Sequence, residues 1–365
     1  MTRRTTRPKA FSAAGFSAAD VRFMGRALAL AERGRGTTQP NPVVGAVIVR
    51  GGRIAAEGFH RKAGEAHAEV NALAELQGSP RGTTIYVTLE PCNHTGRTGP
   101  CTEVLIGARP ARVVVGCRDP NPIVDGRGIA RLRRAGIRVD VGCLERESAA
   151  AIRAYGVAVR EKRPLVTLKA AATLDGFIAQ KTTATRSGRV KRAPIWITSP
   201  AARAAAHELR AAHDAILVGA GTIRADNPRL TVRDARRRPV RQPLRVVLAG
   251  RRLLPRRAHV FDDAAETLTI DDPRGRVAPA RALALLAARG VQSVLVEGGA
   301  AIAGAFIKAG LVDRIALFVA PKLLGGGVGI STGADLAVAR ALRLGPISVK
   351  RVGPDLLLTA DVERA

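Results

Sequence analysis

Short apolar runs and helix-spaced apolar positions alternate along this 365-residue chain. In the first half, the short runs predict strands at residues 43–49, 84–89 and 112–116. Helical spacing predicts helices at residues 67–76, 101–107 and 127–135. A preceding helix begins after Ser17, because Ser17 and Asp20 have the spacing of a capping box. Alternating strands and helices predict a layered α/β domain.

A helical stretch at residues 145–160 ends before Pro164, and proline discourages helix continuation, so we expect a domain boundary there. The first domain would span 17–161 and the second 162–365, while the basic, aperiodic residues 1–16 would be a disordered extension. The second half predicts strands at 165–172, 215–218, 244–248, 292–296 and 314–320, and helices at 200–212, 279–289 and 300–309. An arginine-rich stretch, 233–257, is expected to form loops around one strand, and 349–359 a closing strand pair. The chain is therefore expected to form two different α/β domains.

Composition excludes several classes of protein. Apolar residues make up 46 % of the chain, yet no run approaches the ~20 residues of a membrane span. The basic N-terminus lacks the apolar segment of a secretory signal. Four cysteines are too few for a disulfide scaffold, which favours a reducing, cytoplasmic location.

The net charge of +29 predicts an affinity for anions, either nucleic acids or small phosphorylated ligands. Only nine of the 59 basic residues are lysines, so the arginine excess can also reflect genomic base composition. Eight Phe, two Tyr and one Trp provide few stacking platforms for single strands. A zinc-containing RNA-binding protein stays an alternative, but nucleic acid is not the favoured partner.

His67, Cys92 and Cys101 are candidate zinc ligands, because one imidazole and two thiolates leave a fourth tetrahedral position open for a water molecule. Zinc lowers the pKa of such a water. Glu69, two residues after His67 at a predicted helix start, would transfer protons between that water and a leaving amine. The order matches the zinc nucleobase-deaminase signature H-x-E…P-C-x-x-C, although eight residues separate the two cysteines here.

Each of these candidate residues also has an explanation without a functional role. The three ligands could be scattered buried cysteines and an exposed histidine. His94, in the loop between the cysteines, is either a site contact or a solvated side chain. Cys117 and Cys143 are expected to be inert core residues.

Four segments together closely resemble the bacterial bifunctional riboflavin-biosynthesis deaminase–reductases. They are QPNPVVG at residues 39–45, HAEVNA at 67–72, TLEPCNHTGRTGPC at 88–101 and DPNP at 119–122. The resemblance implies a cytidine-deaminase-like three-layer domain that removes a ring amine, as ammonia, from a diaminopyrimidinone ribosylamine 5′-phosphate. It also implies that Asn41 and His60 line the pyrimidine side of the pocket; otherwise they are a turn asparagine and a surface histidine.

No dinucleotide-binding G-x-G-x-x-G follows a strand in the second half. The glycines at 325–329 are more typical of a flexible loop. Residues 293–304 instead read as a strand, two glycines and a small-residue helix, which suits either a phosphate or a plain tight turn.

Residues 168–176, 219–233 and 320–326 resemble the reductase domain of the same family, which is similar in fold to dihydrofolate reductase. This implies NADPH-dependent reduction of the ribosyl group to a ribityl chain, and a homo-oligomer. By position, the implied NADP contacts are Ala172, Trp196, Thr222, Asp226, Gly299, Ala300, Ala301, Ile302, Ala303, Gly304 and Ala305. The implied substrate contacts are Arg210, Leu230, Arg233 and Glu297.

Lys169 and Asp226 are the polar candidates for proton delivery in the reductase. Lys169 could instead be a strand residue whose stem is buried, and Trp196 a core residue. Pro194 stands where the family has a serine, and residues 151–155 lack the usual Leu-Asn pair. These departures leave open an active deaminase with a degenerate or substrate-shifted reductase domain.

Overall fold

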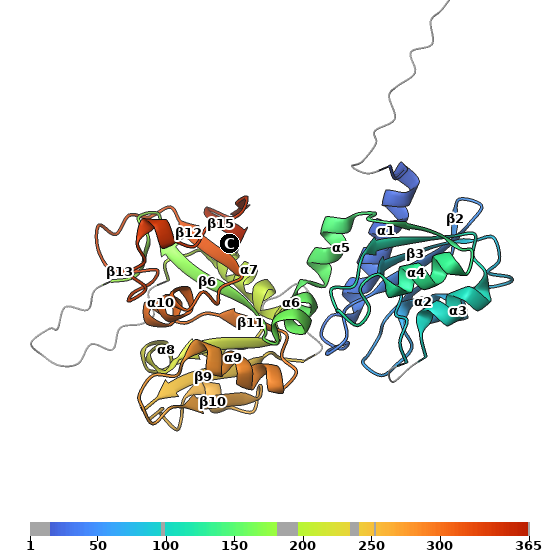
Figure 1. Ribbon diagram of the computed structural model, residues 1–365. Coiled ribbons are helices and arrows are strands. Elements are labelled where there is room, and N and C mark those ends of the chain that lie inside the picture. The colour runs from blue at the N-terminus through green and yellow to red at the C-terminus, as the bar shows by residue number, and fades with distance from the viewer. Residues whose placement is uncertain (1–14, 96–98, 181–195, 234–240, 252, 364–365) are drawn as a thin grey trace, which may run out of the picture. The chain divides into compact units, whose positions relative to one another are not determined.

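The computed structural model describes residues 15–95, 99–180, 196–233, 241–251 and 253–363 (Figure 1). The chain forms two compact units, one ending at Glu161 and the other beginning at Lys162. Residues 1–14 of the expected extension lie outside the described part. Phe16 does not belong to such an extension, because it is buried against Phe23 and Met24 of the first unit.

The first unit contains a five-stranded sheet in the order β2-β1-β3-β4-β5. Its strands are β1 (Gly45–Arg50), β2 (Arg53–Phe59), β3 (Thr84–Leu89), β4 (Arg112–Cys117) and β5 (Arg138–Val141). β1 runs antiparallel to β2 and β3, whereas β3, β4 and β5 are parallel. The sequence analysis missed β2, although Gly51 and Gly52, both with positive φ, form the hairpin turn before it.

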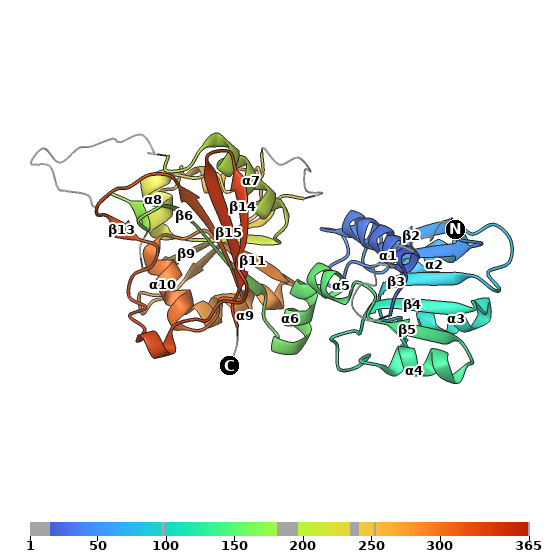
Figure 2. The same ribbon diagram turned by 90° about the horizontal axis from the view of Figure 1, so that it is seen from above.

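Helices cover both faces of this sheet, as Figures 1 and 2 show. They are α1 (Ala18–Ala31), α2 (Ala68–Ala74), α3 (Cys101–Ala108), α4 (Arg127–Arg134) and α5 (Glu145–Ala151). A 3-10 turn, η1 (Glu32–Gly34), follows α1, and α6 (Arg153–Glu161) follows α5. Val47 and Val49 pack into the cluster that contains α1, while Ala46 and Ile48 pack with α2, α3 and α4. This alternation gives the predicted three layers, and the capping box of Ser17 and Asp20 is confirmed.

The second unit contains an eight-stranded sheet in the order β10-β9-β8-β11-β6-β12-β15-β14. Its strands are β6 (Leu165–Thr173), β8 (Ala215–Gly219), β9 (Leu244–Gly250), β10 (Thr267–Asp271), β11 (Ser293–Val296), β12 (Arg314–Ala320), β14 (Ser348–Val352) and β15 (Asp355–Asp361). The six strands from β10 to β12 are parallel, so their carboxyl ends lie along one edge. β15 and β14 complete the sheet antiparallel, which confirms the predicted closing pair.

The described residues of this unit also form four helices and two 3-10 turns. They are α7 (Pro200–Ala211), α8 (Ala220–Asp226), α9 (Pro279–Ala288), α10 (Ala300–Lys308), η2 (His259–Phe261) and η3 (Val338–Arg340). α9 and α10 pack on one face through Leu286 and Phe306, and Ile223 of α8 packs on the other with Leu230. None of the described helices is long and apolar enough to span a membrane.

The glycine-rich segment 325–329 is not the flexible loop that the sequence suggested. It contains β13 (Val328–Gly329), which pairs with β7 (Phe177–Ala179). The Asp175 carboxylate accepts hydrogen bonds from the backbone N–H groups of Leu324 and Gly325. The segment is therefore held at both ends.

Candidate active sites

His67, Cys92 and Cys101 come together from three separate segments of the first unit, as predicted. Their ligand atoms all lie within 4.8 Å of one another. His67 Nδ1 is 3.1 Å from Cys101 Sγ and 3.5 Å from Cys92 Sγ. One nitrogen and two sulfurs at this spacing form a donor set that suits zinc.

Local structure places each of these side chains. His67 is the N-cap residue of α2, and Cys101 is the first residue of α3. The Cys101 backbone N–H donates to Cys92 Sγ at 3.3 Å. Hydrogen bonds from the Cys101 thiol and from His67 lower the pKa of Cys92 to about 4, so this sulfur is a thiolate at neutral pH.

Glu69 lies in the first turn of α2 and is 3 % exposed. Burial raises the pKa of its carboxyl group to about 7. The Cys101 thiol is among its hydrogen-bond partners. A carboxyl group that titrates near neutral pH beside the ligand set can both accept and release a proton.

Asn41 and His60 are linked to each other next to this centre. The His60 Nδ1–H donates to the Ala66 carbonyl at 3.1 Å, which leaves Nε2 to accept from Asn41 Nδ2, also at 3.1 Å. The His60 and His67 rings are 5.2 Å apart. Because Asn41 Nδ2 is used by His60, the amide oxygen of Asn41 is oriented away from that contact.

Glu90 is a buried acid that the sequence analysis did not single out. Glu90 directly follows β3, lies two residues before Cys92 and is 3 % exposed. Its carboxylate accepts hydrogen bonds from four backbone N–H groups, those of Asp119, Gly126, Gly128 and Ile129. Glu90 thereby attaches the segment that carries Cys92 to the loop before α4 and to the first turn of α4. The sequence feature that could have drawn attention to Glu90 is its place as a single acidic residue between an apolar strand and Pro91.

The remaining cysteines and His94 are further from the chemistry. Cys117 and Cys143 are buried thiols whose pKa burial raises to about 12 and about 11, in keeping with inert core residues. The His94 side chain is exposed, and Gly96, Arg97 and Thr98 of its loop lie outside the described residues.

In the second unit, Arg210, Glu297 and Lys169 form a buried charge cluster. Arg210 donates from Nε and Nη2 to the two Glu297 oxygens, both at 2.8 Å. Lys169 Nζ is 3.9 Å from Glu297 Oε2. Although burial alone would raise it, the pKa of Glu297 is held at about 2 by these two cations. The structure thus joins a predicted proton donor to two predicted substrate contacts.

Leu230 and Arg233 lie beside this cluster. Arg210 Nη1 donates to the Thr231 carbonyl at 3.1 Å, and Arg233 Nη1 donates to Thr231 Oγ1 at 3.1 Å. Leu230 is 2 % exposed. All four predicted substrate contacts of the reductase therefore belong to one region.

Three of the predicted NADP contacts lie at the carboxyl ends of neighbouring parallel strands, and residues 300–305 lie in α10. Thr222 comes after β8, Gly299 after β11, and Ala172 lies at the end of β6, and these three strands are adjacent in the sheet. A Cβ added to Gly299, the N-cap of α10, would meet no atom within 4 Å, so the backbone there is open to a ligand. A Cβ on Gly304 would lie 1.9 Å from the Thr332 carbonyl, so packing alone explains that glycine.

Trp196 and Asp226 are both exposed. The Trp196 side chain is 60 % exposed, with the Arg203 guanidinium 4.7 Å from the centre of its ring, so it is no core residue. Lys322 Nζ donates to the Ile197 carbonyl at 2.7 Å, next to Trp196. Asp226 is the last residue of α8. Pro194, the departure noted above, lies outside the described residues.

Comparison with known families assigns both units. The cytidine and deoxycytidylate deaminase zinc-binding region matches residues 17–117, and the RibD C-terminal domain matches residues 164–358. The chain is 40 % identical to the riboflavin biosynthesis protein RibD of Escherichia coli, covering 93 % of this chain and 98 % of that protein. It is 43 % identical to RibD of Mycobacterium tuberculosis, covering 92 % and 95 %.

Solved structures agree with this assignment. Acinetobacter baumannii RibD superimposes with a TM-score of 0.82 at 35 % identity, covering 95 % of this chain and 99 % of that one. The Thermotoga maritima diaminohydroxyphosphoribosylaminopyrimidine deaminase/5-amino-6-(5-phosphoribosylamino)uracil reductase gives 0.82 at 36 % identity, covering 94 % and 99 %.

Proposed function

The chain belongs to the family of bifunctional riboflavin-biosynthesis deaminase–reductases, and from this premise we propose which of its residues perform each reaction. It is a riboflavin-biosynthesis enzyme with a zinc-binding deaminase domain and an NADPH-using reductase domain. The deaminase domain would span 17–161 and the reductase domain 162–365, since the compact units divide between Glu161 and Lys162.

His67, Cys92 and Cys101 are the proposed zinc ligands, and their grouping within 4.8 Å is the observation that carries the deaminase assignment. When bound, zinc supplies a Lewis acid that lowers the pKa of a water molecule. The Cys92 thiolate and the N-cap position of His67 would hold the ligand set in place.

Glu69 is the proposed proton carrier. With a pKa of about 7, its carboxylate can take up a proton from the attacking water and its carboxylic acid can deliver one to the leaving amine. The side chain is 3 % exposed, so solvent does not compete for that proton. Glu69 would move protons without ligating the metal.

Asn41 and His60 would orient the pyrimidine. The His60 ring, fixed by the Ala66 carbonyl, accepts from Asn41 Nδ2 and leaves the Asn41 amide oxygen as an acceptor for a ring N–H or amino group. His60 then acts through Asn41, as a positioning residue.

Arg210, Leu230, Arg233 and Glu297 are the proposed substrate contacts of the reductase, and Lys169 and Asp226 are its proposed catalytic residues. An arginine fork suits the 5′-phosphate of a phosphoribosylaminopyrimidine. Lys169, whose Nζ lies near Glu297, would deliver the proton that accompanies hydride transfer, with Asp226 as the second proton-delivering group. Residues 299–305, which are the N-cap and first residues of α10, would hold NADPH together with Ala172, Trp196, Thr222 and Asp226.

A two-step assay tests the proposal. Zinc-loaded protein is given the diaminopyrimidinone ribosylamine 5′-phosphate, and ammonia release is measured; NADPH is then added and its oxidation followed. We expect both steps, with 5-amino-6-ribitylaminouracil 5′-phosphate as product. Failure of ammonia release by fully metallated protein would reject the deaminase assignment, and ammonia release without NADPH oxidation would reject the reductase assignment.

We also propose the substrate class, the oligomeric state and the cellular location of the protein. The protein would act on a phosphorylated pyrimidine rather than on nucleic acid. It would form a homo-oligomer in the cytoplasm, where the four free thiols among the described residues would stay reduced. Light scattering of the purified chain tests the oligomer.

A further inference from the structure

Residues 227–233, here called the substrate segment, follow α8 and contain two of the proposed substrate contacts of the reductase. The segment begins at Asn227 and includes Leu230 and Arg233, both in the proposed substrate set. Its conformation is unusual, because Asn227 has a φ of 41° and Leu230 a φ of 50°. A non-glycine residue stays in this left-handed region only where its surroundings impose it, and leucine rarely adopts it.

Two arginines hold the backbone on either side of Leu230: Arg245, which is fully buried, and Arg210, whose side chain is 14 % exposed. Arg245 Nη1 donates to the carbonyl of Arg229, the residue before Leu230, at 3.4 Å. Arg210 Nη1 donates to the carbonyl of Thr231, the residue after it, at 3.1 Å. The Leu230 side chain is buried with Ile216 and Val247. We call Arg210 and Arg245 the arginine clamp.

Arg245 is fixed through the two terminal nitrogens of its guanidinium, while its buried Nε has no hydrogen-bond partner among the described residues. It lies in β9 and its side chain is fully buried. Its guanidinium donates to Asp262 Oδ1 at 2.7 Å, and to the backbone carbonyls of His259, Asp262 and Ala265. One side chain thus ties the substrate segment to residues 259–265, the loop that leads into β10.

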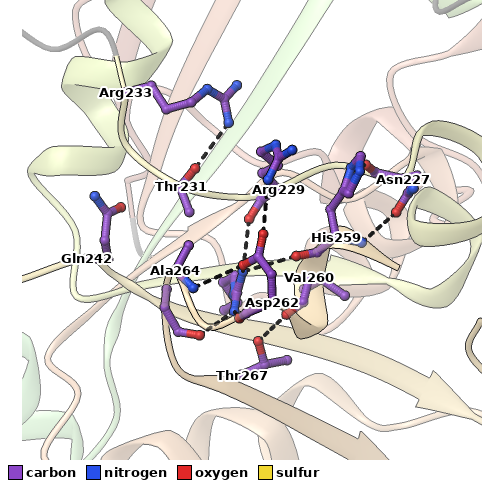
Figure 3. Close-up of polar contacts among 12 residues, drawn as sticks. Asn227, Arg229, Thr231, Arg233, Gln242, His259, Val260, Asp262, Ala264 and Thr267 are labelled. Atoms are coloured by element: carbon purple, nitrogen blue, oxygen red, sulfur yellow. Dashed lines mark hydrogen bonds and ion pairs between the residues drawn. The ribbon is translucent and has the colours of Figure 1, made fainter. Parts of the chain in front are cut away.

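Further contacts join the same two stretches of chain, and Figure 3 shows several of them. Arg229 Nη1 pairs with Asp262 Oδ2 at 3.1 Å. The His259 backbone N–H donates to Asn227 Oδ1 at 2.8 Å, and the His259 ring donates to the Asn227 carbonyl at 2.9 Å. These contacts fix the start of the segment, while Arg245 reaches its middle.

We propose that Arg245 is a positioning residue for the reductase, which with Arg210 clamps Leu230 in its left-handed conformation and so presents Leu230 and Arg233 to the substrate. The inference rests on the proposed function of this site. Arg245 touches neither substrate nor cofactor in this account; it acts through the backbone of the substrate segment.

The geometry requires a guanidinium rather than any cation. Arg245 spreads its donors over two nitrogens that serve the Arg229 carbonyl on one side and the Ala265 carbonyl on the other. A lysine carries its donors on one atom and cannot reach both. Loss of the contact to Arg229 would let Leu230 relax towards an ordinary φ and shift Arg233 with it.

The test compares Arg245→Lys with wild type. We expect its KM for 5-amino-6-(5-phosphoribosylamino)uracil to rise by about tenfold, with kcat changed much less, because a displaced segment weakens substrate binding before it affects hydride transfer. The dissociation constant of that compound, measured calorimetrically without NADPH, should rise in parallel. Ammonia release by the deaminase in the same preparation should stay at the wild-type rate.

A matched control and a milder variant complete the test. Arg163→Lys changes another arginine of this unit, whose guanidinium pairs with Asp313 and donates to the Pro164 carbonyl, and should leave KM unchanged. Asp262→Asn, at a partly exposed partner of Arg245, should raise KM by about threefold and serves if Arg245→Lys does not fold.

The outcomes separate this inference from the assignment beneath it. Unchanged KM and dissociation constant in a folded Arg245→Lys, or in Asp262→Asn if only that variant folds, would overturn the clamp alone. An equal rise in Arg163→Lys would also overturn it, since the effect would be general destabilisation. A wild-type protein that neither binds nor reduces the phosphoribosylaminouracil would overturn the proposed reductase site, and the clamp with it.

Discussion

Two glutamates, one in each unit, have pKa values that their surroundings shift in opposite directions. Burial beside sulfur ligands raises the pKa of Glu69 to about 7. The Glu297 side chain is 8 % exposed, and Arg210 and Lys169 hold its pKa at about 2. Glu69 is therefore poised to exchange protons near neutral pH, whereas Glu297 is a permanent anion that orders two cations.

Glu69→Gln should abolish deamination, lowering the rate of ammonia release by about 10²-fold or more, because an amide cannot transfer the proton. Zinc content should stay at the wild-type level, since Glu69 is assigned no metal bond. Elemental analysis of the purified variant checks this. Glu65→Gln, at an exposed position near the same helix, is the matched control and should leave the rate unchanged. Loss of zinc from Glu69→Gln would show that the carboxylate is a ligand.

The low pKa of Glu297 predicts that the free energy of unfolding of the reductase unit falls in acid. A carboxylate whose folded pKa is about 2 and whose ordinary value is 4.5 stabilises the fold above pH 4.5, and this contribution is lost as pH falls towards 2. The full difference corresponds to roughly 3 kcal/mol. The advantage of wild type over Glu297→Gln in free energy of unfolding should therefore shrink between pH 6 and pH 3.

Urea unfolding followed by the fluorescence of Trp196, the only tryptophan of the chain, reports on this unit. An advantage that stays constant over the same pH range would mean that Glu297 has no depressed pKa in the folded protein.

Among the elements, α10, the helix that follows β11, has one glycine that packing requires and another whose backbone is open to a ligand. Gly304 of α10 approaches the Thr332 carbonyl so closely that an added Cβ would overlap it, whereas Gly299 at the helix start faces open space. Both glycines are in the proposed cofactor turn, but only Gly299 has a backbone that a ligand can approach.

Gly304→Ala should lower the free energy of unfolding of the reductase unit by about 1–3 kcal/mol, because backbone must move to admit the methyl group. Gly299→Ala, its matched control, should leave that free energy unchanged and raise the dissociation constant of NADPH by about tenfold, since the methyl group fills the open space. Thermal unfolding and NADPH fluorescence titration measure the two quantities. Equal NADPH affinity in Gly299→Ala and wild type would remove this turn from the cofactor site.

Elements with strong local signals were predictable from the sequence. The capping box at Ser17 fixed the start of α1, and apolar runs fixed β3 and β4, because these strands are buried on both faces. β2 and β10 were missed, since each has an exposed or half-buried pattern with no continuous apolar run. β2 and β10 form because they pair with β1 and β9, and the local pattern of apolar residues contains no information about that pairing.

Side chains whose role depends on distant partners were the least predictable. His67, Cys92 and Cys101 could be found because ligand types and their order are written in the sequence. Glu90 and Arg245 could not, because each is explained by backbone groups from other segments: Asp119 to Ile129 for Glu90, and Arg229 to Ala265 for Arg245. An arginine in an arginine-rich stretch reads as solvated, yet this one is fully buried.

At the scale of the whole molecule, the chain carries two chemistries in two separately packed units. The clusters around β1 and β3 share no residue with those around β8 and β11. The candidate metal ligands all belong to the first unit, and the buried Arg210–Glu297–Lys169 cluster belongs to the second. Each activity should therefore be removable without loss of the other.

Zinc removal tests this central claim most directly. The protein is treated with a chelator, its zinc content is measured, and the two reactions are assayed separately, with 5-amino-6-(5-phosphoribosylamino)uracil supplied directly to the reductase. We predict that ammonia release is lost in proportion to zinc and returns when zinc is restored, while NADPH oxidation continues at the untreated rate. Ammonia release that persists in zinc-free protein, or NADPH oxidation that disappears with the metal, would contradict the account.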